Sequence, residues 1–204
     1  KLTGTLLDLL YPPKCPFCRR VLDAPGMCPE CEKTLPWTDE AHSLRELRGG
    51  LLCAAPLWYE GPVREAVRRF KFHGGVCAAG PLGELIAQAA AERLSGEFDT
   101  VAWVPVSAKR LRKRGYDQSR LLAERACRLW DVEPEALLRK IRDNPAQSSL
   151  ERAGDRWKNT QGVYEAAGSP AGKRILLIDD VCSTGSTLVS AAGVLFSAGA
   201  AGVV

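Results

Sequence analysis

The stretch that decides the fold is Ile175-Leu176-Leu177-Ile178-Asp179-Asp180-Val181-Cys182-Ser183-Thr184-Gly185-Ser186-Thr187-Leu188. Its apolar start predicts a buried parallel strand, and two carboxylates follow where that strand ends. A turn of small residues comes next, and apolar residues at helical spacing indicate that a helix begins near Thr187. Because ligands of open α/β sheets bind outside the carboxyl ends of the strands, this turn is a candidate binding site.

The turn combines two kinds of chemistry. A helix N-terminus presents backbone N–H groups and the positive end of the helix dipole, which suit a phosphate. Asp179 and Asp180 cannot serve that phosphate, because like charges repel, but they suit ribose hydroxyls or the water shell of Mg²⁺. Together these features predict a site for ribose 5-phosphate. Hydroxyl groups that can add hydrogen bonds to the phosphate belong to Ser183, Thr184, Ser186 and Thr187.

The same stretch resembles the signature of type I phosphoribosyltransferases, in which an apolar strand is followed by Asp-Asp and then by Thr-Gly-x-Thr. The resemblance implies that Asp179 and Asp180 hold the ribose of phosphoribosyl pyrophosphate and are the catalytic candidates. It implies that the 5-phosphate is held by Cys182, Ser183, Thr184, Gly185, Ser186 and Thr187. The alternative is an ordinary turn between strand and helix with a solvated pair of carboxylates.

Composition sets broad limits. The chain has 204 residues, which allows one α/β core and a small additional module. A formal net charge of +4 permits an anionic ligand or nucleic acid but requires neither. No apolar run has the roughly 18 residues of a membrane span, and residues 1–11 show no cleavage pattern of a signal peptide. We expect a protein of the reducing cytoplasm, because a chain of this size does not need disulfides.

Two Cys-x-x-Cys pairs stand near the N-terminus, at Cys15, Cys18, Cys28 and Cys31. Paired knuckles at this spacing predict a tetrahedral thiolate site, for which Zn²⁺ is the usual ion. Such a site has no open position, so the zinc would be structural. The alternative is a pair of redox dithiols, but those normally cap a helix of a thioredoxin-like unit, which the sequence does not suggest.

We expect three parts: an N-terminal helix and zinc module at 1–38, a polar linker at 39–50, and an α/β domain at 51–204. Periodicity predicts helices at 3–10, 61–70, 81–94, 119–130 and 187–197, with a short one at 134–138. Strands are predicted at 51–59, 101–106 and 175–178, and a further strand begins at Val203. Cys53 stands apart from the other cysteines and is predicted to be a small buried residue.

A cationic run follows the strand at 101–106. Ser107 and Ala108 lead into it, and five of the six residues at 109–114 are basic: Lys109, Arg110, Arg112, Lys113 and Arg114. Such runs are usually solvated. This one begins at the carboxyl end of a strand, on the same sheet edge as the acidic pair, where pyrophosphate could bind. Single-stranded nucleic acid is the other candidate ligand, with Tyr116 available for stacking.

These motifs together resemble the ComF family, the competence-associated branch of phosphoribosyltransferase-like proteins, over nearly the whole chain. The cysteine knuckles, Phe70-Lys71-Phe72, a Val-Pro-Val run and an Arg-Gly-Phe-Asn-Gln segment all have counterparts. The last of these departs from the family, with Tyr116 for Phe and Asp117 for Asn. Asp117 adds a carboxylate near the predicted anion site and leaves the polar role of that segment open.

A long polar stretch, from about 139 to 162, is predicted to be a loop. The family resemblance implies that it closes over the reacting sugar and excludes water. Residues that fit the ComF pattern there include Gln147, Arg152, Arg156 and Asn159. The alternative is a surface loop with no role in function.

The resemblance implies a doubly wound α/β fold with a mostly parallel sheet of the type I phosphoribosyltransferase kind, behind a small zinc-knuckle module. It implies binding of phosphoribosyl pyrophosphate with Mg²⁺, in DNA uptake or nucleotide metabolism; whether transfer follows, and to which acceptor, stays open. The other hypothesis is a non-catalytic module of natural transformation that binds single-stranded DNA and works with the competence machinery. A third has the zinc module only stabilising the N-terminus.

Overall fold

A computed structural model of the chain describes residues 12–143 and 162–204. Within these ranges the central sheet has three strands in the order β3-β6-β7: β3 (Thr100–Trp103), β6 (Arg174–Ile178) and β7 (Gly202–Val203). β3 and β6 pair in parallel, from Thr100 opposite Ile175 to Trp103 opposite Ile178. Both strands therefore end at the same edge of the sheet, as the sequence predicts.

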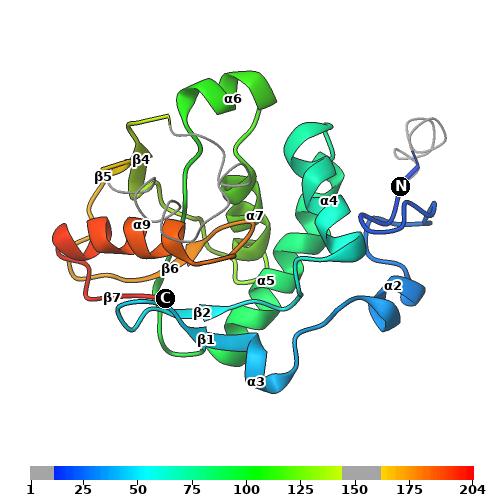
Figure 1. The fold of residues 1–204 in the computed structure, drawn as a ribbon, viewed down its shortest axis with the longest axis horizontal. Coiled ribbons are helices and arrows are strands. Elements are labelled where there is room, and N and C mark those ends of the chain that lie inside the picture. Colours follow the sequence, from blue (N-terminus) through cyan, green and yellow to red (C-terminus); the bar gives the residue numbers. More distant parts are fainter. Residues whose placement is uncertain (1–11, 144–161) are drawn as a thin grey trace.

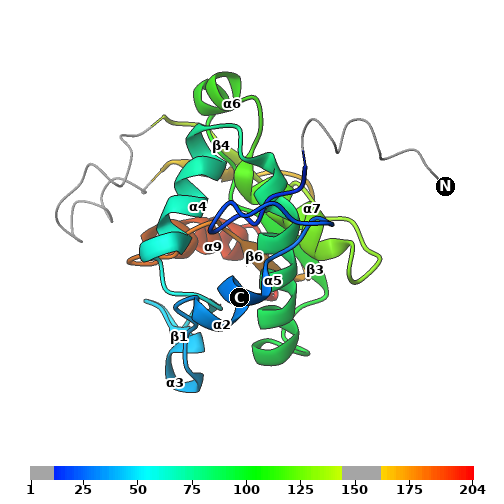
Figure 2. The same ribbon diagram turned by 90° about the vertical axis from the view of Figure 1, so that its right-hand side faces the viewer.

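Side chains of β6 alternate between two buried clusters. Leu176 and Ile178 lie in one cluster with α5 (Ala79–Arg93) and α7 (Gln118–Cys127). Ile175 and Leu177 lie in the other with α9 (Ser186–Ser197). Figures 1 and 2 show α9 on one side of β6 and α5 and α7 on the other. A parallel sheet with helices on both faces confirms the predicted doubly wound α/β fold.

The chain leaves β3 and β6 in opposite directions across the sheet. After β3 and α7 it returns on the outer side of β3, where Glu135 forms a parallel bridge with Ala102. After β6 and α9 it returns on the other side of β6 as β7. In open α/β sheets the ligand crevice lies at such a reversal, outside the carboxyl ends of the two strands, which here lead into the segments 104–107 and 179–187.

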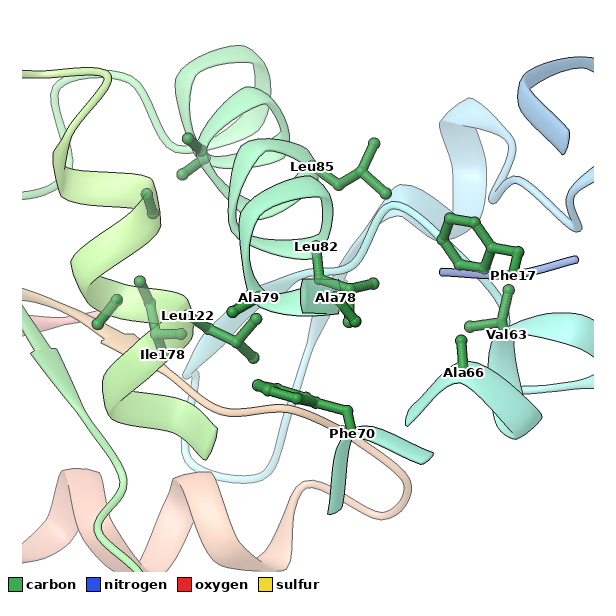
Figure 3. Close-up of a cluster of buried hydrophobic side chains, with 14 of the residues drawn as sticks. Phe17, Val63, Ala66, Phe70, Ala78, Ala79, Leu82, Leu85, Leu122 and Ile178 are labelled. Atoms are coloured by element: carbon green, nitrogen blue, oxygen red, sulfur yellow. The ribbon is translucent and has the colours of Figure 1, made fainter. Parts of the chain in front are cut away.

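The cysteine module shares a core with the α/β domain. It includes α2 (Pro29–Thr34), and it packs against α4 (Gly61–Phe72). Phe17 lies beside Val63 and Ala66 of α4 (Figure 3), and all three belong to the cluster that contains Ile178 of β6. A short 3₁₀ helix, η1 (Val76–Ala78), connects α4 to α5.

The segment predicted as a polar linker, 39–50, is structured. It contains α3 (Glu40–Ser43) and β1 (Leu44–Glu46), and β1 pairs antiparallel with β2 (Leu52–Ala54). Asp39 caps α3 by accepting a hydrogen bond of 2.9 Å from the backbone N–H of His42. The segment is polar because its short elements are largely exposed. The strand predicted at 51–59 is confined to β2.

The short helix predicted at 134–138 is wrong. Glu135 bridges to β3, and β4 (Leu138–Lys140) pairs antiparallel with β5 (Tyr164–Ala166). Sheet edges that lie far away in the sequence overrode the local helical tendency. β4 also shows that the predicted loop begins later than residue 139. The expected helix at 3–10 and the four loop residues Gln147, Arg152, Arg156 and Asn159 lie outside the described residues.

The other helices agree with the predicted ones within a few residues, and the cationic run forms a helix of its own, α6 (Ala108–Arg114). Figure 1 shows α6 at the top of the molecule, remote from β7 and the β1–β2 hairpin. Among the described residues, no helix is both long enough and apolar enough to cross a bilayer.

Candidate functional site

Asp179 and Asp180 follow the last residue of β6 and lie at the crevice. Asp179 Oδ1 accepts a hydrogen bond of 3.0 Å from Ser119 Oγ of α7 and one of 2.9 Å from the backbone N–H of Asp180. Asp180 Oδ1 lies 2.8 Å from the Lys71 ammonium of α4. The Lys71 and Asp180 side chains are 21% and 12% exposed. The two carboxylates therefore have different partners, one neutral and one cationic.

The charged groups of this cluster shift one another's pKa values. Burial and the neighbouring Asp180 carboxylate raise the pKa of Asp179 to about 7, although Lys71 acts to lower it. Burial acts to lower the pKa of Lys71, but Asp180 and Asp179 outweigh it and the pKa is raised. Asp179 thus exchanges a proton near neutral pH. It is able to donate a hydrogen bond to a ligand hydroxyl in one state and to accept one from it in the other.

The turn after the acidic pair enters α9 through Gly185. Gly185 adopts a left-handed conformation with φ of 74°, and a Cβ there would lie 2.7 Å from Leu47 Cδ1. Only glycine fits this position without displacement of Leu47. Gly185 supplies no side-chain cap to α9. Thr184 Oγ1 and Ser186 Oγ lie 2.8 Å apart, so two hydroxyls meet where the helix begins. This geometry suits a phosphate.

Arg45 of β1 ties the β1–β2 hairpin to this turn. Its Nη2 donates to the carbonyl oxygens of Cys182 and Ser183, at 3.1 Å each, and to Cys182 Sγ at 2.9 Å. Hydrogen bonds from Cys53 and Arg45 lower the pKa of Cys182 to about 6 against the effect of burial. The Cys182 side chain and carbonyl are therefore already engaged, and its backbone N–H is the group suited to a phosphate. Cys53 is buried, as the sequence predicts.

The N-terminal half of α6 faces a carboxylate. Ser107 caps the helix, since its Oγ accepts from the backbone N–H of Arg110 at 3.3 Å. The same hydroxyl donates to Asp143 Oδ1 at 2.8 Å. Lys109 and Arg110 each lie 3.8 Å from Asp143. An anionic ligand at this end of α6 would have to compete with the Asp143 carboxylate.

The C-terminal half of α6 is divided between surface and interior. Arg112 and Lys113 are exposed. Arg114 is partly buried, donates to Gln118 Oε1 at 2.6 Å, and places its guanidinium 4.9 Å from the centre of the Phe72 ring. The exposed pair is suited to a polyanion, whereas Arg114 joins α6 to α7 and α4.

The segment that departs from the family pattern has a structural role. Asp117 accepts from the backbone N–H of Val106 at 2.9 Å and from that of Arg120 at 3.2 Å, so it caps α7 and fixes the chain after β3. Tyr116 stacks on Phe70, with ring centres 5.9 Å apart, and donates its hydroxyl proton to the Phe70 carbonyl. The expectation that Tyr116 is available to stack on nucleic-acid bases is therefore wrong.

The four predicted zinc ligands converge. The Sγ atoms of Cys15, Cys18, Cys28 and Cys31 all lie within 4.8 Å of one another. Zn–S bonds of about 2.3 Å in a tetrahedron separate the sulfurs by roughly 3.8 Å, so the cluster fits a zinc ion. Cys28 also caps α2, since its Sγ accepts from the backbone N–H of Cys31 at 3.4 Å. The convergence of all four sulfurs favours structural zinc over two separate dithiols.

A cavity of about 570 Å³ opens beside the acidic pair. It runs between the β1–β2 hairpin, α4 and α5 on one side and the end of β6 on the other. Its wall is mostly apolar, and the polar groups in it include His42, Arg45 and Asp180. Nothing in the sequence pattern indicated this cavity, because it forms between segments that are far apart along the chain.

Three residues of the site were missed by the site assignments made from sequence: Lys71, Arg45 and Ser119. Lys71 lies in Phe70-Lys71-Phe72, a segment that supports the family resemblance but suggests no role for the lysine. Arg45 lies in the segment taken for a linker. Ser119 was assigned only to a helix, yet it stands beside Asp117 in the segment that follows β3. That neighbourhood was the one signal that could have placed it at the crevice.

Fold and site define the class of protein: an α/β domain of the phosphoribosyltransferase type with an N-terminal zinc ribbon. Comparison with known families supports both parts, because the double zinc ribbon domain matches residues 6–43 and the phosphoribosyl transferase domain matches residues 118–204.

Relatives that match over most of the chain confirm the resemblance to the ComF family. The chain is 26% identical to competence protein ComFC of Bacillus subtilis (strain 168), over 92% of this chain and 73% of the relative. It is 28% identical to competence protein F of Haemophilus influenzae, over 86% of this chain and 87% of the relative. It is 29% identical to DNA utilization protein YhgH of Escherichia coli (strain K12), over 93% of this chain and 86% of the relative. The chain is thus similar to ComF-type competence proteins over most of its length.

Proposed function

We propose that the chain binds phosphoribosyl pyrophosphate, or a related sugar phosphate, together with Mg²⁺ in the crevice between the carboxyl ends of β3 and β6. The observation that carries the proposal is the acidic pair at the end of β6, directly before the small-residue turn that opens α9. In this arrangement the residues from Cys182 to Thr187 hold the 5-phosphate. Asp179 and Asp180 hold the ribose hydroxyls.

The donor set at the end of β6 fits Mg²⁺, because carboxylate oxygens and water are the ligands that this ion prefers. When bound with the ligand, Mg²⁺ neutralises charge on the pyrophosphate. The chain's own groups orient the sugar: Thr184 and Thr187 donate hydroxyl hydrogen bonds to the 5-phosphate. Gly185 lets the backbone approach it, and Ser119 fixes the Asp179 carboxyl.

The cavity beside the acidic pair supports a transfer reaction in addition to binding. In a phosphoribosyltransferase reaction, an acceptor attacks the anomeric carbon and pyrophosphate leaves. The reaction passes through a state in which positive charge develops on the ribose. The protein's part is to position the two reactants and to stabilise that charge, here with the carboxylates of Asp179 and Asp180. The cavity of about 570 Å³ next to Asp180 is large enough for a flat heterocyclic acceptor.

The test is calorimetric titration with phosphoribosyl pyrophosphate, ribose 5-phosphate and pyrophosphate, each with Mg²⁺ and with a chelator of divalent cations that leaves the zinc in place. We expect phosphoribosyl pyrophosphate with Mg²⁺ to bind most tightly, and ribose 5-phosphate to bind with little dependence on Mg²⁺. Absence of binding by both sugar phosphates would refute the proposal. A screen of nucleobases for release of pyrophosphate then separates a transferase from a binding protein.

A second candidate function is binding of single-stranded DNA during DNA uptake. Two observations favour it: the exposed pair Arg112 and Lys113 on α6, and the names of the relatives, which are competence and DNA utilization proteins. The competence machinery would be the partner in that case. None of the eight cysteines is joined in a disulfide bond, and this is in keeping with a reducing, cytoplasmic location for either function.

A further inference from the structure

The end of α4 touches the zinc module at its first knuckle. Arg69 Nη2 donates to the carbonyl oxygen of Pro16 at 2.7 Å and to that of Phe17 at 3.0 Å. Pro16 and Phe17 are the two residues between the predicted ligands Cys15 and Cys18. A guanidinium that binds both carbonyls fixes the knuckle backbone relative to the helix.

Two residues further along, the same helical turn touches the acidic pair. Lys71 Nζ lies 2.8 Å from Asp180 Oδ1, and both side chains are largely buried. Phe70, which lies between Arg69 and Lys71, is fully buried, and its carbonyl accepts the hydrogen bond of Tyr116. The final turn of α4 therefore contacts the zinc knuckle, the segment after β3 and the acidic pair.

Packing makes this turn a stiff connection. Phe17 of the knuckle lies against Val63 and Ala66 of α4, and Phe70 points from α4 towards Leu122 and Ile178 (Figure 3). Because close-packed side chains do not deform freely, a shift of the knuckle displaces α4 as a unit. Such a shift would move the Lys71 ammonium away from Asp180 and leave two adjacent carboxylates without their cation.

We propose that the zinc module positions Lys71 at the sugar-phosphate site through Arg69 and the last turn of α4. Lys71 is then a binding residue, whose ammonium holds Asp180 in place and favours a polyanionic ligand, and Arg69 is a positioning residue. The zinc module is in this view part of the ligand site and not only a stabilising element of the N-terminus. The identity of the ligand rests on the proposed function; the connection between the knuckle and Lys71 does not.

The first test needs no ligand. Lys71 is labelled with acetic anhydride, and the rate is followed by mass spectrometry, with Lys109, whose side chain is 79% exposed, as internal reference. In wild type, the buried and paired Lys71 should react much more slowly than Lys109. Arg69→Met, and removal of zinc from wild type, should each speed labelling of Lys71 and leave Lys109 unchanged. Unchanged labelling of Lys71 in both cases would overturn the proposal.

The matched control for Arg69→Met is Arg68→Met. Arg68 is the preceding residue of α4, is exposed and lies 3.8 Å from Glu65 of its own helix. In Arg68→Met, Lys71 should be acetylated at the same rate as in wild type. Thermal unfolding and zinc content of both variants show whether each is folded and holds its metal. If Arg69→Met fails to fold, the comparison of zinc-loaded and zinc-free wild type still decides the question.

The second test measures the connection at the ligand site, by titration with phosphoribosyl pyrophosphate. Zinc removal should weaken binding by wild type about fivefold or more, which is the size of a typical coupling between sites. Removal should have little further effect on Arg69→Met, because the connection is already broken. If zinc removal weakens the affinity of wild type and of Arg69→Met by the same factor, the proposal is contradicted. Lys71→Arg should retain more affinity than Lys71→Met, since it keeps the charge.

The two tests separate the two claims. If no form of the protein binds the sugar phosphate while Lys71 labelling responds to zinc and to Arg69→Met, the proposed function fails and the positioning role stands. If the sugar phosphate binds equally well with and without zinc, and labelling is unchanged, the proposed function stands and the positioning role fails.

Discussion

Ser119 Oγ donates a hydrogen bond of 3.0 Å to Asp179 Oδ1, which joins the first turn of α7 to the end of β6 across 60 residues of sequence. The bond brings the segment after β3 and the acidic pair to the same crevice. Burial of the Asp179 carboxyl and the neighbouring Asp180 carboxylate raise the pKa of Asp179 to about 7, although this hydrogen bond acts to lower it. The first prediction follows from that pKa.

Asp179 should make stability depend on pH. Its folded pKa of about 7 lies above the value near 4 of an unfolded Asp, so the folded chain binds the extra proton between these values. Stability then falls as pH rises from about 4 to 7, by at most about 1.4 kcal/mol per pH unit. Asp179→Asn should remove this fall. The free energy of unfolding of the variant, relative to that of wild type, should therefore be higher at pH 8 than at pH 5. Urea unfolding across this range measures it.

The control for that prediction is Asp99→Asn. Hydrogen bonds from Arg174 and Thr100 outweigh burial and lower the pKa of Asp99, so its stabilising effect is complete above pH 4 and is lost only in more acidic solution. Between pH 5 and pH 8 this variant should keep the slope of wild type. If the curves of stability against pH for wild type and Asp179→Asn run parallel between pH 5 and pH 8, Asp179 is ionised over that whole range and the prediction is refuted.

The cysteine cluster should hold one zinc per chain. Cys28→Ser removes a predicted ligand and the cap of α2, and it should abolish zinc binding and lower the unfolding temperature, because structural zinc supplies folding free energy. Cys127→Ser changes a buried cysteine outside the cluster and should keep its zinc. Metal analysis of reduced, purified protein measures both. Absence of zinc from wild type prepared without chelators would refute the assignment.

The exposed pair on α6 should determine the salt dependence of DNA binding. For a single-stranded oligonucleotide, the slope of log affinity against log salt should shrink by roughly 0.7 for each phosphate contact that Arg112→Ala and Lys113→Ala remove. The double variant Arg64→Ala, Arg68→Ala removes the same charge from exposed positions of α4 and should keep the slope. Equal slopes in wild type and in the α6 variant would show that the run is only a solvated face.

Gly185→Ala should weaken sugar-phosphate binding. Alanine is strained at a φ of 74°, and its Cβ would lie 2.7 Å from Leu47 Cδ1, so Leu47 or the turn before α9 has to shift. Gly193→Ala is the matched control: Gly193 lies within α9, and a Cβ there meets nothing within 4 Å. The control should bind normally and gain up to about 1 kcal/mol of stability. Titration with ribose 5-phosphate distinguishes the two, and normal binding by Gly185→Ala would contradict the site.

Local sequence pattern predicted the parts of the site that are continuous in the chain. The run from Ile175 to Thr187 contains strand, acidic pair and turn in order, and Cys15 to Cys31 contains the whole metal cluster. Lys71, Arg45 and Ser119 could not be assigned this way, because each acquires its role from a contact with a distant segment. Tyr116 was misassigned for the same reason, since its partner is Phe70.

The measurement that tests the account most directly is titration of phosphoribosyl pyrophosphate with Mg²⁺ into the double variant Asp179→Asn, Asp180→Asn. Wild type and the charge-matched control Asp23→Asn, Asp131→Asn, changed at exposed positions, should bind alike. The acidic-pair variant should lose most of that affinity and most of its dependence on Mg²⁺, while it remains folded. Binding by this variant that equals wild type, with and without Mg²⁺, would contradict the central claim that the end of β6 is the sugar-phosphate site.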